Sequence, residues 1–550
     1  FCQFYAREAL RLEAGGAREA RGVIAVVAPW NFPLAIPCGM AAAALAAGNA
    51  ALLKGAEQTP LCAEAVVRVL REVGVPAAVC AHLPGDGPTT GAALVEHERV
   101  DGLVFTGSAA VGSRLYAQMA GSPDRKGRGA RMAITEMGGK NAVLVAASAD
   151  IDEAVLGCLR AAFGHAGQKC SAASRILVDE AIAERFAERF AAAAADLRLG
   201  DGVERGVDVN PVISAEDAER LRTTAASAIA EAEARGGRCL LDGSARPDGA
   251  GHRVAPTVLL LPTEAAVAEG SQARIEHFGP IVHVVPVRWG DALAVQAATP
   301  YALTAGLYTQ LEADVDAFVD GVRAGNAYVN RPITGARVAI EPFGGFDASG
   351  TGPKAGGSDY LAAFYAPAPA EVPSADAVAA AIAARREARL PTLPIAGQRT
   401  WNQVRAVRRG VAVVATGSNL SARARAHLAA AGAVAEDRAR ELLVVGPEAL
   451  AADPALGGAT RLGGCAELGA HLRQLMDLAV VVLEDADAAG LFALALATHG
   501  DRGGGAVPAL IRHDLDADAI AALHLPLTTI AVSTLRHGAP MVLELPESGS

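Results

Sequence analysis

The sequence has little cysteine and no cysteine clusters. Its eight cysteines lie at positions 2, 38, 62, 80, 158, 170, 239 and 465, and none forms a close repeated pair. This spacing argues against both a disulfide framework and a zinc site, so we expect no bound metal. A reducing cytosol is the simplest compartment for such a chain.

A block of basic residues is also missing. The net charge of the 550 residues is -11, and the isoelectric point is near 5.6. A nucleic-acid partner would need a basic patch, so the sequence offers no electrostatic basis for one. The charge balance is that of an ordinary acidic protein.

The sequence also lacks an unbroken apolar run that could cross a membrane. Residues 22–53 carry no charged side chain, but Pro29, Pro33 and Pro37 interrupt them. A membrane span would have to keep its backbone hydrogen-bonded through these prolines. A strand, a turn and an alanine-rich helix describe the stretch better.

The chain does contain an alternation of short apolar runs and helical patterns up to about residue 365. Strands are predicted at 22–29, 50–55, 102–107, 141–146 and 174–179, and helices at 60–74 and 148–164. This order is typical of an α/β protein with a largely parallel sheet. The length indicates two or three domains.

Residues 366–400 differ in composition, because prolines surround one alanine-rich helix there. This composition predicts a linker. After it, apolar strands are predicted at 411–415, 441–446, 479–485, 507–514 and 527–534, with helical patterns between them. We therefore expect a second α/β domain over 401–550.

The segment AFGHAGQKCSAASR places Cys170 among small residues. A buried structural cysteine is the ordinary interpretation of an isolated thiol. A reactive thiol instead needs access, small neighbours that let a substrate approach, and donors for the charge that develops on the attacked oxygen. The neighbours of Cys170 favour the second interpretation.

Two other motifs could supply the remaining groups of such a site. Glu136 stands before two glycines in ITEMGGKN and is a candidate general base, with a solvated surface glutamate as the alternative. Asn31 follows Trp30 in APWNFP. Asn31 is either a turn asparagine or, together with the Cys170 backbone N–H, part of an oxyanion hole.

A nucleotide site is indicated by FTGSAAVG, residues 105–112. The motif follows an apolar strand and opens a helix, so Ser108 and the helix amides would face a pyrophosphate. The alternative is a plain strand-to-helix turn, because the motif lacks the full glycine pattern of dinucleotide sites.

Together these motifs resemble the aldehyde dehydrogenase superfamily. Eight segments occur in the order and rough spacing of that family: PWNFP, LLKGAEQTP, LPGDG, FTGSAAVG, EMGGKN, GQKCSAASR, EHFGPIV and EPFGGFDASGTG. The likeness covers about residues 1–365. It implies a Rossmann-like NAD-binding domain, an α/β catalytic domain with a β-flap, and hydride transfer to NAD.

The resemblance also implies roles for single residues. Cys170 would be the nucleophile, Glu136 would activate the hydrolytic water, and Asn31 would hold the oxyanion. Gly55 stands where the family usually has proline, at the adenosine end of the site. The implied cofactor contacts are Trp30, Lys54, Glu57, Gly107, Ser108, Gly112, Glu276 and Phe278.

Within the superfamily the chain is most similar to the L-glutamate γ-semialdehyde (Δ1-pyrroline-5-carboxylate) dehydrogenases. FGHAGQKCSAASR, NRPITGARVAIEPFGGF and GTGPKAGGSDYL carry this likeness. It implies that Ser171, Gly335 and Ala336 anchor the substrate's α-carboxylate, and that Phe163 and Phe343 contact the substrate. The implied reaction oxidises the semialdehyde to L-glutamate in proline catabolism. Another aldehyde substrate and a non-enzymatic module are the alternatives.

The likeness implies five parts of the chain. They are a NAD-binding domain that lacks its amino-terminal part (1–140), a catalytic domain (141–325), a substrate-anchor loop that returns to the NAD-binding domain (326–365), the linker (366–400) and a C-terminal extension (401–550). Lys354, in the third part, is interpreted as a solvated loop lysine.

The extension resembles that of bifunctional proline utilization A (PutA) proteins, in which it has a degenerate dehydrogenase fold. This likeness implies that a proline dehydrogenase with FAD precedes Phe1. The chain starts at Phe1 without a methionine, so we expect it to be a fragment, and the family-like β-flap implies a homo-oligomer. Cys465, in LGGCAELG, has no base motif upstream, so we expect no second dehydrogenase centre there.

Overall fold

The computed structural model describes most of the chain. The described residues are 1–123, 125, 131–244 and 251–367, and then 373–387, 389–391, 398–404, 410–415, 420–434, 442–447, 450, 453–456, 459–462, 468, 478–483, 509–511 and 527–533. The chain divides into two compact units. Unit 1 comprises residues 1–138, 337–389 and 403–528, and unit 2 comprises residues 139–336, 390–402 and 529–550.

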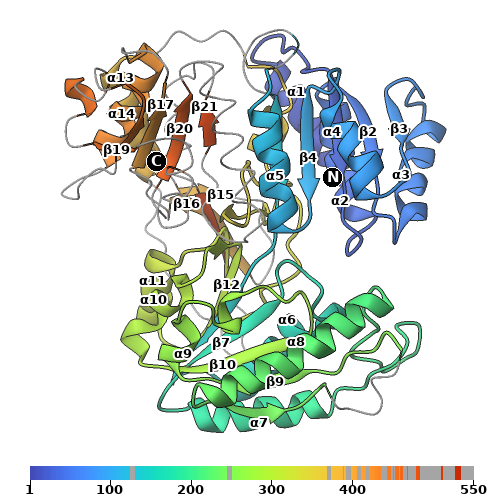
Figure 1. The fold of residues 1–550 in the computed structure, drawn as a ribbon, viewed down its shortest axis with the longest axis vertical. Coiled ribbons are helices and arrows are strands. Elements are labelled where there is room, and N and C mark those ends of the chain that lie inside the picture. The colour runs from blue at the N-terminus through green and yellow to red at the C-terminus, as the bar shows by residue number, and fades with distance from the viewer. Residues whose placement is uncertain are drawn as a thin grey trace. The chain divides into compact units, whose positions relative to one another are not determined.

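Unit 1 contains a five-stranded parallel sheet in the order β3-β2-β1-β4-β5. Its strands are β1 (Val23–Val27), β2 (Ala50–Lys54), β3 (Cys80–His82), β4 (Gly102–Thr106) and β5 (Met132–Glu136). Its helices include α1 (Cys2–Glu13), α2 (Ala35–Ala46), α3 (Pro60–Glu72), α4 (Ala92–Glu96), α5 (Ala109–Ala120) and α12 (Ser358–Ala362) (Figure 1). The strands predicted at 22–29, 50–55 and 102–107 and the helix predicted at 60–74 are confirmed.

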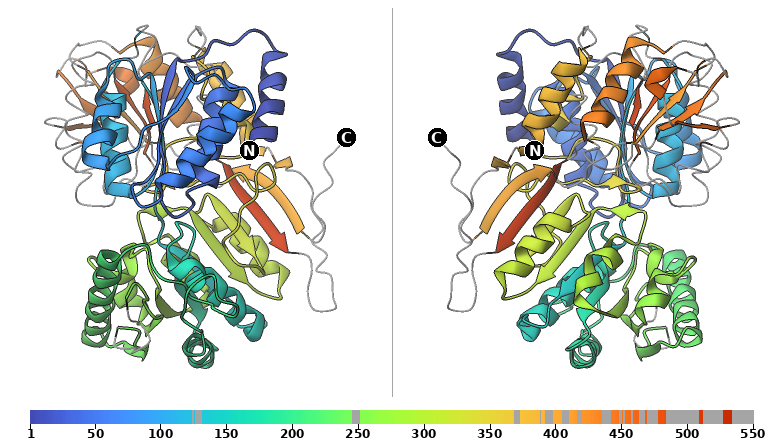
Figure 2. Two further views of the ribbon diagram at one scale, coloured as in Figure 1. Left: turned by 90° about the vertical axis from the view of Figure 1, so that its right-hand side faces the viewer. Right: turned by 90° about the vertical axis from the view of Figure 1, so that its left-hand side faces the viewer.

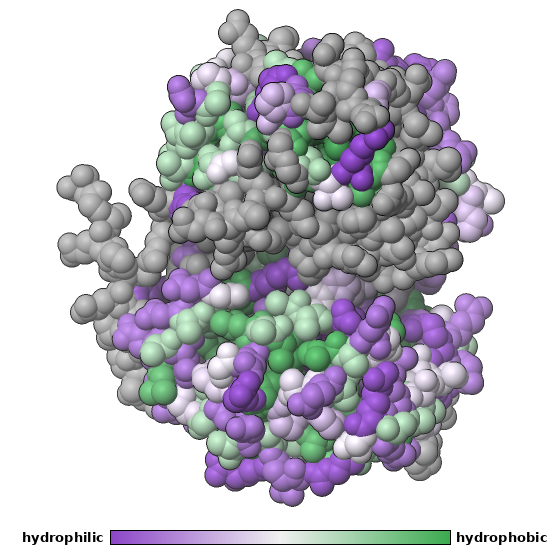
Figure 3. Space-filling model, turned by 60° about the vertical axis from the view of Figure 1, so that its left-hand side comes forward, coloured by the Kyte–Doolittle hydropathy of each residue, from purple (hydrophilic) through white to green (hydrophobic). Residues whose placement is uncertain are grey.

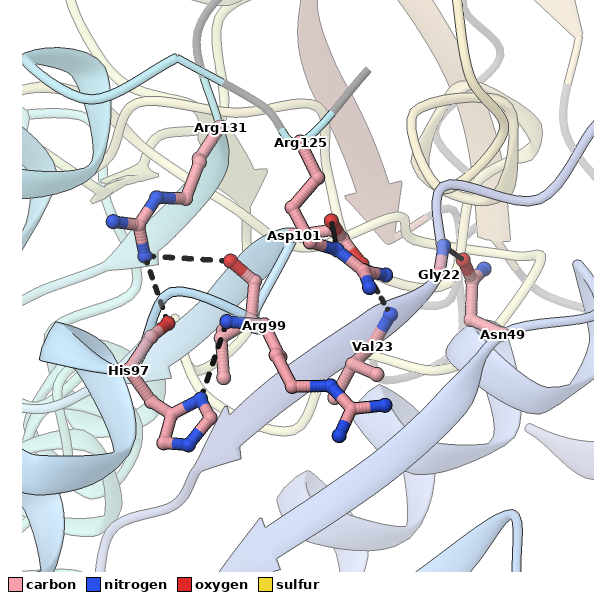
Figure 4. Close-up of polar contacts among 9 residues, drawn as sticks. Gly22, Val23, Asn49, His97, Arg99, Asp101, Arg125 and Arg131 are labelled. Carbon is pink, nitrogen blue, oxygen red and sulfur yellow. Dashed lines mark hydrogen bonds and ion pairs between the residues drawn. The ribbon is translucent and has the colours of Figure 1, made fainter.

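Polar side chains fasten the amino-terminal edge of this sheet, where each strand begins. Asp101, directly before β4, accepts a hydrogen bond from the Val23 N–H at 2.9 Å. It accepts two more from the Arg125 guanidinium at 2.7 and 2.6 Å (Figure 4). A Cβ on Gly22 would stand 2.1 Å from the Asp101 Oδ2, so glycine is required there. The buried carboxylate is therefore fully satisfied.

The neighbouring strands of this edge are held in the same way. The Asn49 side chain, directly before β2, accepts a hydrogen bond from the Gly22 N–H at 2.9 Å (Figure 4). Arg131, directly before β5, donates to the carbonyls of residues 95, 97 and 100. Side chains that hydrogen-bond to backbone groups thus hold the strands together at the amino-terminal edge.

Unit 2 is built on a larger sheet. Strands β13-β12-β6-β7-β10-β9 are neighbours and run parallel, and β8 pairs antiparallel with β9. The bounds are β6 (Asn141–Val145), β7 (Ala173–Asp179), β8 (Arg238–Leu241), β9 (Thr257–Leu260), β10 (Ile281–Val287), β12 (Thr304–Tyr308) and β13 (Asn326–Val329). The helices are α6 (Ile151–Phe163), α7 (Ala183–Ala195), α8 (Ala215–Ala234), α9 (Thr263–Val267), α10 (Ala292–Ala297) and α11 (Glu312–Gly321). The strands predicted at 141–146 and 174–179 and the helix predicted at 148–164 are confirmed.

The last described strand of the chain joins the sheet of unit 2. β22 (Leu527–Ser533) pairs in parallel with β13, and β16 (Gln398–Val404) and β15 (Arg389–Pro391) extend the sheet beyond it (Figure 2). The strand predicted at 527–534 therefore forms, but in this sheet rather than in the extension. The chain passes from unit 2 back to unit 1 between residues 336 and 337. The predicted domain bounds stay predictions.

Residues 410–511 contain another five-stranded parallel sheet, in the order β19-β18-β17-β20-β21. Its strands are β17 (Gly410–Val414), β18 (Leu442–Val445), β19 (Thr460–Leu462), β20 (Leu478–Leu483) and β21 (Ala509–Ile511). Helix α13 (Ala375–Glu387) comes before β17 in the sequence, and helix α14 (Ala422–Val434) comes between β17 and β18. The four strands predicted here are confirmed, and α13 is the helix of the predicted linker. Cys465 lies outside the described residues. The likeness of this part to a degenerate dehydrogenase stays a prediction.

The surface of unit 2 mixes hydrophilic and hydrophobic residues, as the lower part of the space-filling view shows (Figure 3). Its exposed large apolar side chains include Leu156, on α6, and Val203, in the connection between α7 and α8. Scattered exposed apolar residues are normal for a protein surface. Across the described parts of the chain, no helix combines the length and the apolar character that a membrane span needs.

Candidate active site

The candidates of unit 1 lie along one edge of its sheet, at the carboxyl ends of the strands. β2 ends at Lys54, β5 ends at Glu136, and the loop after β1 carries Asn31. The parallel register sets Lys54 level with Val27 of β1, and Glu136 level with Thr106 of β4. The crevice beyond the carboxyl ends of parallel strands is the usual ligand site of such sheets.

Lys54 and Glu57 form an ion pair at this edge. Lys54 is buried, and its Nζ lies 3.0 Å from the Glu57 Oε2, while the Glu57 side chain is half exposed. Partial burial raises the pKa of Glu57, but hydrogen bonds from its own backbone and from Lys54 outweigh this effect, so the pKa lies below its ordinary value. A charged donor and a charged acceptor side by side suit the neighbouring hydroxyls of a ribose.

Ser108 is exposed and caps helix α5 directly after β4, where its Oγ accepts a hydrogen bond from a first-turn N–H at 3.4 Å. Side-chain packing requires glycine at positions 107 and 112, on either side of Ser108. A Cβ on Gly107 would come within 2.5 Å of the Phe105 ring, and one on Gly112 within 2.6 Å of the Met137 sulfur. The predicted strand-to-helix turn is confirmed, and the amino end of such a helix attracts phosphate.

Glu136 is not a solvated surface glutamate. Both of its carboxylate oxygens are buried, and neither has a hydrogen-bond partner among the described residues. Burial raises the pKa of Glu136 well above its ordinary value, while the nearby Gly345 amide and the charge of Lys354 act in the opposite direction. A carboxylate with a raised pKa can take up a proton near neutral pH, as a general base must.

The loop that contains EPFGG folds back over the end of β5. Phe343 and Ala355 exchange two backbone hydrogen bonds of 2.8 Å. A Cβ on Gly344 would stand 2.7 Å from the Glu136 Oε1 and 3.2 Å from the Lys354 Cα. Glycine therefore lets this loop bring Lys354 close to the Glu136 carboxylate.

Lys354 is half-buried in this loop. Burial lowers its pKa to about 7, and the charge of Glu136 acts in the opposite direction. The interpretation of Lys354 as a solvated loop lysine is therefore wrong. The reason is the return of the loop onto β5, which withdraws the amine from water.

Cys170 lies in the turn directly before β7 and is half-buried. Cys158, on α6, is the contrasting case, because it is fully buried and burial raises its pKa. Lys169 neighbours the Cys170 thiol. Burial lowers the pKa of this amine, and the charge of Cys170 acts in the opposite direction. The exposure of Cys170 favours a reactive thiol over a structural one.

A turn with unusual backbone angles precedes Cys170. His165 and Ala166 adopt left-handed conformations with φ of 62° and 52°, and Gly167 follows at 70°. Such conformations cost about 1–2 kcal/mol for each non-glycine residue and persist only where packing enforces them. A Cβ on Gly167 would lie 2.6 Å from the Gly279 carbonyl, so the turn packs against the segment before β10.

Glu276 lies in this segment before β10 and accepts a hydrogen bond from the Gly139 N–H at 2.8 Å. Burial raises the pKa of Glu276 to about 7, against the effects of the Gly139 amide and of Lys140. The Lys140 amine is buried without a hydrogen-bond partner in the described part of the chain, and burial lowers its pKa to about 7. Phe278, two residues after Glu276, has a φ of 55°.

The residues predicted to contact substrate differ in their surroundings. Ser171 is buried, and its carbonyl accepts a 3.4 Å hydrogen bond from the Thr304 hydroxyl. Gly335 is exposed at a φ of 86°, as in a turn, and Ala336 is half-buried. Phe163 is 1% exposed and stacks on a phenylalanine of α7, with 5.8 Å between ring centroids. This position favours a packing role for Phe163 over contact with a ligand.

The predicted site residues are divided between the two units. Unit 1 holds Trp30, Asn31, Lys54, Glu57, Gly107, Ser108, Gly112, Glu136 and Phe343, and unit 2 holds Phe163, Cys170, Ser171, Glu276, Phe278, Gly335 and Ala336. The sequence pattern did not single out Lys140 and Asn141, although both stand inside EMGGKN. The available signal was a polar residue at the start of a strand that is otherwise apolar.

Comparison with known proteins gives the class. Residues 11–367, more than half of the chain, match the aldehyde dehydrogenase family. The chain therefore belongs to the aldehyde dehydrogenase family.

Individual relatives carry more specific names. The chain is 38% identical over 376 residues to the 1-pyrroline-5-carboxylate dehydrogenase of Bacillus subtilis (strain 168), a match that covers 66% of this chain and 70% of that protein. It is 39% identical over 343 residues to the bifunctional protein PutA of Klebsiella aerogenes, and this match covers 62% of this chain. The chain spans only 26% of the length of that PutA.

Solved structures agree with these relatives. A 1-pyrroline-5-carboxylate dehydrogenase from Thermus with bound NAD matches with a TM-score of 0.60 and 37% identity, over 66% of this chain and 71% of that one. Proline utilization A from Bdellovibrio bacteriovorus matches with a TM-score of 0.61 and 38% identity, over 67% of this chain and 38% of that one.

Proposed function

We propose that this protein oxidises L-glutamate γ-semialdehyde to L-glutamate, with NAD as the hydride acceptor. The observation that carries the proposal is the half-buried Cys170 thiol in a turn before β7, next to the lysine amine of residue 169. The relatives named 1-pyrroline-5-carboxylate dehydrogenase support the choice of substrate.

The described groups fit a dinucleotide. The Lys54–Glu57 pair offers a donor and an acceptor to one ribose, Ser108 opens a helix whose amino end attracts the pyrophosphate, and Glu276 can accept from the second ribose. Trp30, Gly107, Gly112 and Phe278 complete the proposed set. When bound, NAD supplies the hydride acceptor that no side chain of the protein can replace.

In the proposed reaction the Cys170 thiolate attacks the aldehyde carbon, and the Asn31 amide and the Cys170 N–H hold the oxyanion that forms. Loss of hydride from this carbon converts the thiohemiacetal into a thioester. Glu136 then takes a proton from water as the water attacks the thioester, which releases the acid and returns the thiolate. One aldehyde, one water and one NAD⁺ become one carboxylate, one NADH and two protons.

The substrate carboxylate needs its own donors. We assign the Ser171 hydroxyl and the backbone N–H groups of Gly335 and Ala336 to this role, since a carboxylate is bound well by several donors that converge on it. These three residues belong to the same unit as Cys170. Phe343 is the proposed apolar contact on the substrate chain.

The test is aldehyde-dependent formation of NADH by the 550-residue chain. We expect a higher kcat/KM for the γ-semialdehyde than for propanal, and we expect Cys170→Ala to abolish turnover while NAD still binds. An equal kcat/KM for propanal would contradict the proposed substrate and favour another aldehyde. Loss of NAD binding in Cys170→Ala would show that the nucleophile is misplaced.

The bifunctional PutA relatives support one further part of the proposal. We propose that the activity is linked to a flavin-containing proline dehydrogenase, in a homo-oligomer of the cytoplasm. The coding sequence on the 5′ side of the Phe1 codon tests the link, and sedimentation of the purified protein tests the oligomer.

A further inference from the structure

The side chain of Asn141 is buried at the start of β6, 3% exposed, and hydrogen-bonds to the segment that carries Cys170. Its Nδ2 donates to the Cys170 carbonyl at 2.7 Å and to the Ala172 carbonyl at 2.9 Å. Its Oδ1 accepts from the Thr304 N–H, the first residue of β12, at 3.0 Å. One amide group thus ties the Cys170 segment to two strands of the sheet.

The position of Asn141 explains why an amide is needed there. The pairing of β6 with β7 is irregular at this point, since Asn141 lies opposite Ala173 and the next residue of β6 lies opposite Arg175. A β-bulge leaves backbone groups without ladder partners. The Asn141 side chain supplies the missing donors to the carbonyls just before β7.

Gly139 allows the close approach of these groups. A Cβ on Gly139 would stand 2.6 Å from the Asn141 Oδ1 and 3.0 Å from the Cys170 carbonyl oxygen. The same glycine donates its N–H to Glu276. The three residues 139–141 therefore contact both the candidate nucleophile segment and the candidate cofactor carboxylate.

We propose that Asn141 is a positioning residue for the nucleophile. By fixing the carbonyls on both sides of Ser171, it sets the direction of the Cys170 thiol and of the Cys170 N–H. The inference rests on the proposed function, in which these two groups attack the aldehyde and hold the oxyanion. A displacement of about 1 Å in such groups lowers a rate by about a hundredfold.

The chain offers a matched control in Asn49, which makes the same three kinds of bond in unit 1. Its Oδ1 accepts from the Gly22 N–H at 2.9 Å, and its Nδ2 donates to the carbonyls of Ala44 and Phe364 at 3.1 and 3.0 Å. It is also 3% exposed. Asn→Asp at either position turns a donor into a carboxylate oxygen that faces two carbonyls, so both variants should lose stability.

The experiment compares Asn141→Asp with Asn49→Asp in the 550-residue chain. Four quantities are measured: the melting temperature, kcat, KM for NAD, and the rate at which iodoacetamide labels the Cys170 peptide, identified by mass spectrometry. We expect both variants to melt at lower temperature. Asn141→Asp should also lower kcat by about ten- to a hundredfold and change the labelling rate by about tenfold, with KM for NAD within about twofold. Asn49→Asp should leave kcat and labelling within about twofold of the unmodified chain.

A loss of stability in Asn141→Asp with unchanged kcat and unchanged labelling would overturn the proposal, because Asn141 would then only support the fold. If Asn141→Asp does not accumulate as folded protein, the pair Asn141→Ser and Asn49→Ser carries the same comparison, since serine keeps one donor. An unmodified chain that is labelled at Cys170 but oxidises no aldehyde would remove the proposed function. The labelling comparison would still decide the role of Asn141.

Discussion

Two carboxylates at opposite edges of the five-stranded sheet in unit 1, those of Asp101 and Glu136, have opposite surroundings. At the amino-terminal edge, Asp101 accepts hydrogen bonds from the Val23 N–H and from Arg125, and Asn49 accepts one from the Gly22 N–H (Figure 4). At the carboxyl-terminal edge, both oxygens of Glu136 are buried without a partner in the described structure. An unsatisfied buried polar group costs about 1–3 kcal/mol. In this sheet the satisfied Asp101 carboxylate holds the strands together, whereas the unsatisfied Glu136 carboxylate is the candidate catalytic group.

In unit 2, the candidate nucleophile and the candidate cofactor carboxylate precede strands instead of following them. Cys170 and Glu276 precede β7 and β10, which run parallel, so both candidates lie toward the amino ends of these strands. The candidates of unit 1 follow the strands instead.

The largest expected effect is a loss of activity on changing Glu136, whose carboxylate oxygens have no hydrogen-bond partner in the described structure. Glu136→Gln should lower kcat by about 10²- to 10⁴-fold, because an amide cannot take the proton of the attacking water. A first turnover of NADH should remain, since Glu136 acts after hydride transfer. Rapid-mixing and steady-state absorbance measure the two phases. Unchanged steady-state turnover would remove Glu136 from the mechanism.

A change of Asp101, whose carboxylate is fully hydrogen-bonded, should lower stability rather than activity. Asp101→Asn places an amide against the Arg125 guanidinium, so we expect the free energy of unfolding to fall by about 2 kcal/mol. kcat should stay within about twofold of the unmodified chain. Urea unfolding and the aldehyde assay check the two halves. A large loss of kcat without loss of stability would contradict the structural role that we assign to Asp101.

Lys54 tests the cofactor end of the carboxyl-terminal edge. Lys54→Met keeps the buried stem but removes the charged donor beside Glu57, and a hydrogen bond to a charged group is worth about 1.5–3 kcal/mol. KM for NAD should therefore rise at least about tenfold, with little change in kcat. An unchanged KM would place the adenosine ribose elsewhere.

The smallest effect concerns the pH dependence of stability. Because the folded state raises the pKa of Glu136, its stabilising contribution is present below the unfolded pKa and is lost as pH rises through the folded pKa. Glu136→Gln should then match the unmodified chain near pH 4 and melt at higher temperature near pH 9. Melting curves at the two pH values measure this. A variant that is less stable at high pH would indicate that the Glu136 carboxylate has partners in the folded protein.

Much of the fold follows from local patterns. The apolar runs at 22–29 and 50–55 become β1 and β2 because buried parallel strands are continuous apolar segments. FTGSAAVG becomes a strand, a serine cap and a helix, because the serine side chain satisfies an amide of the first turn. These features depend only on neighbours in the chain.

The features that local patterns did not reveal all depend on contacts between distant segments. Lys354 is half-buried because its loop returns to β5, more than 200 residues earlier in the chain. β22 joins β13 rather than the nearby strands of the extension. An apolar strand presents the same backbone groups to any partner, so its sequence does not specify which sheet it joins.

By itself the sequence determined the class of the protein, the parallel α/β elements and the residue types available for chemistry, because motifs and periodicity are local properties of the chain. Only the tertiary structure decided which polar groups are satisfied and which are not. Burial and hydrogen bonding depend on segments that meet in space. These surroundings give Asp101 a structural role and leave the two carboxylate oxygens of Glu136 without a hydrogen-bond partner in the described structure.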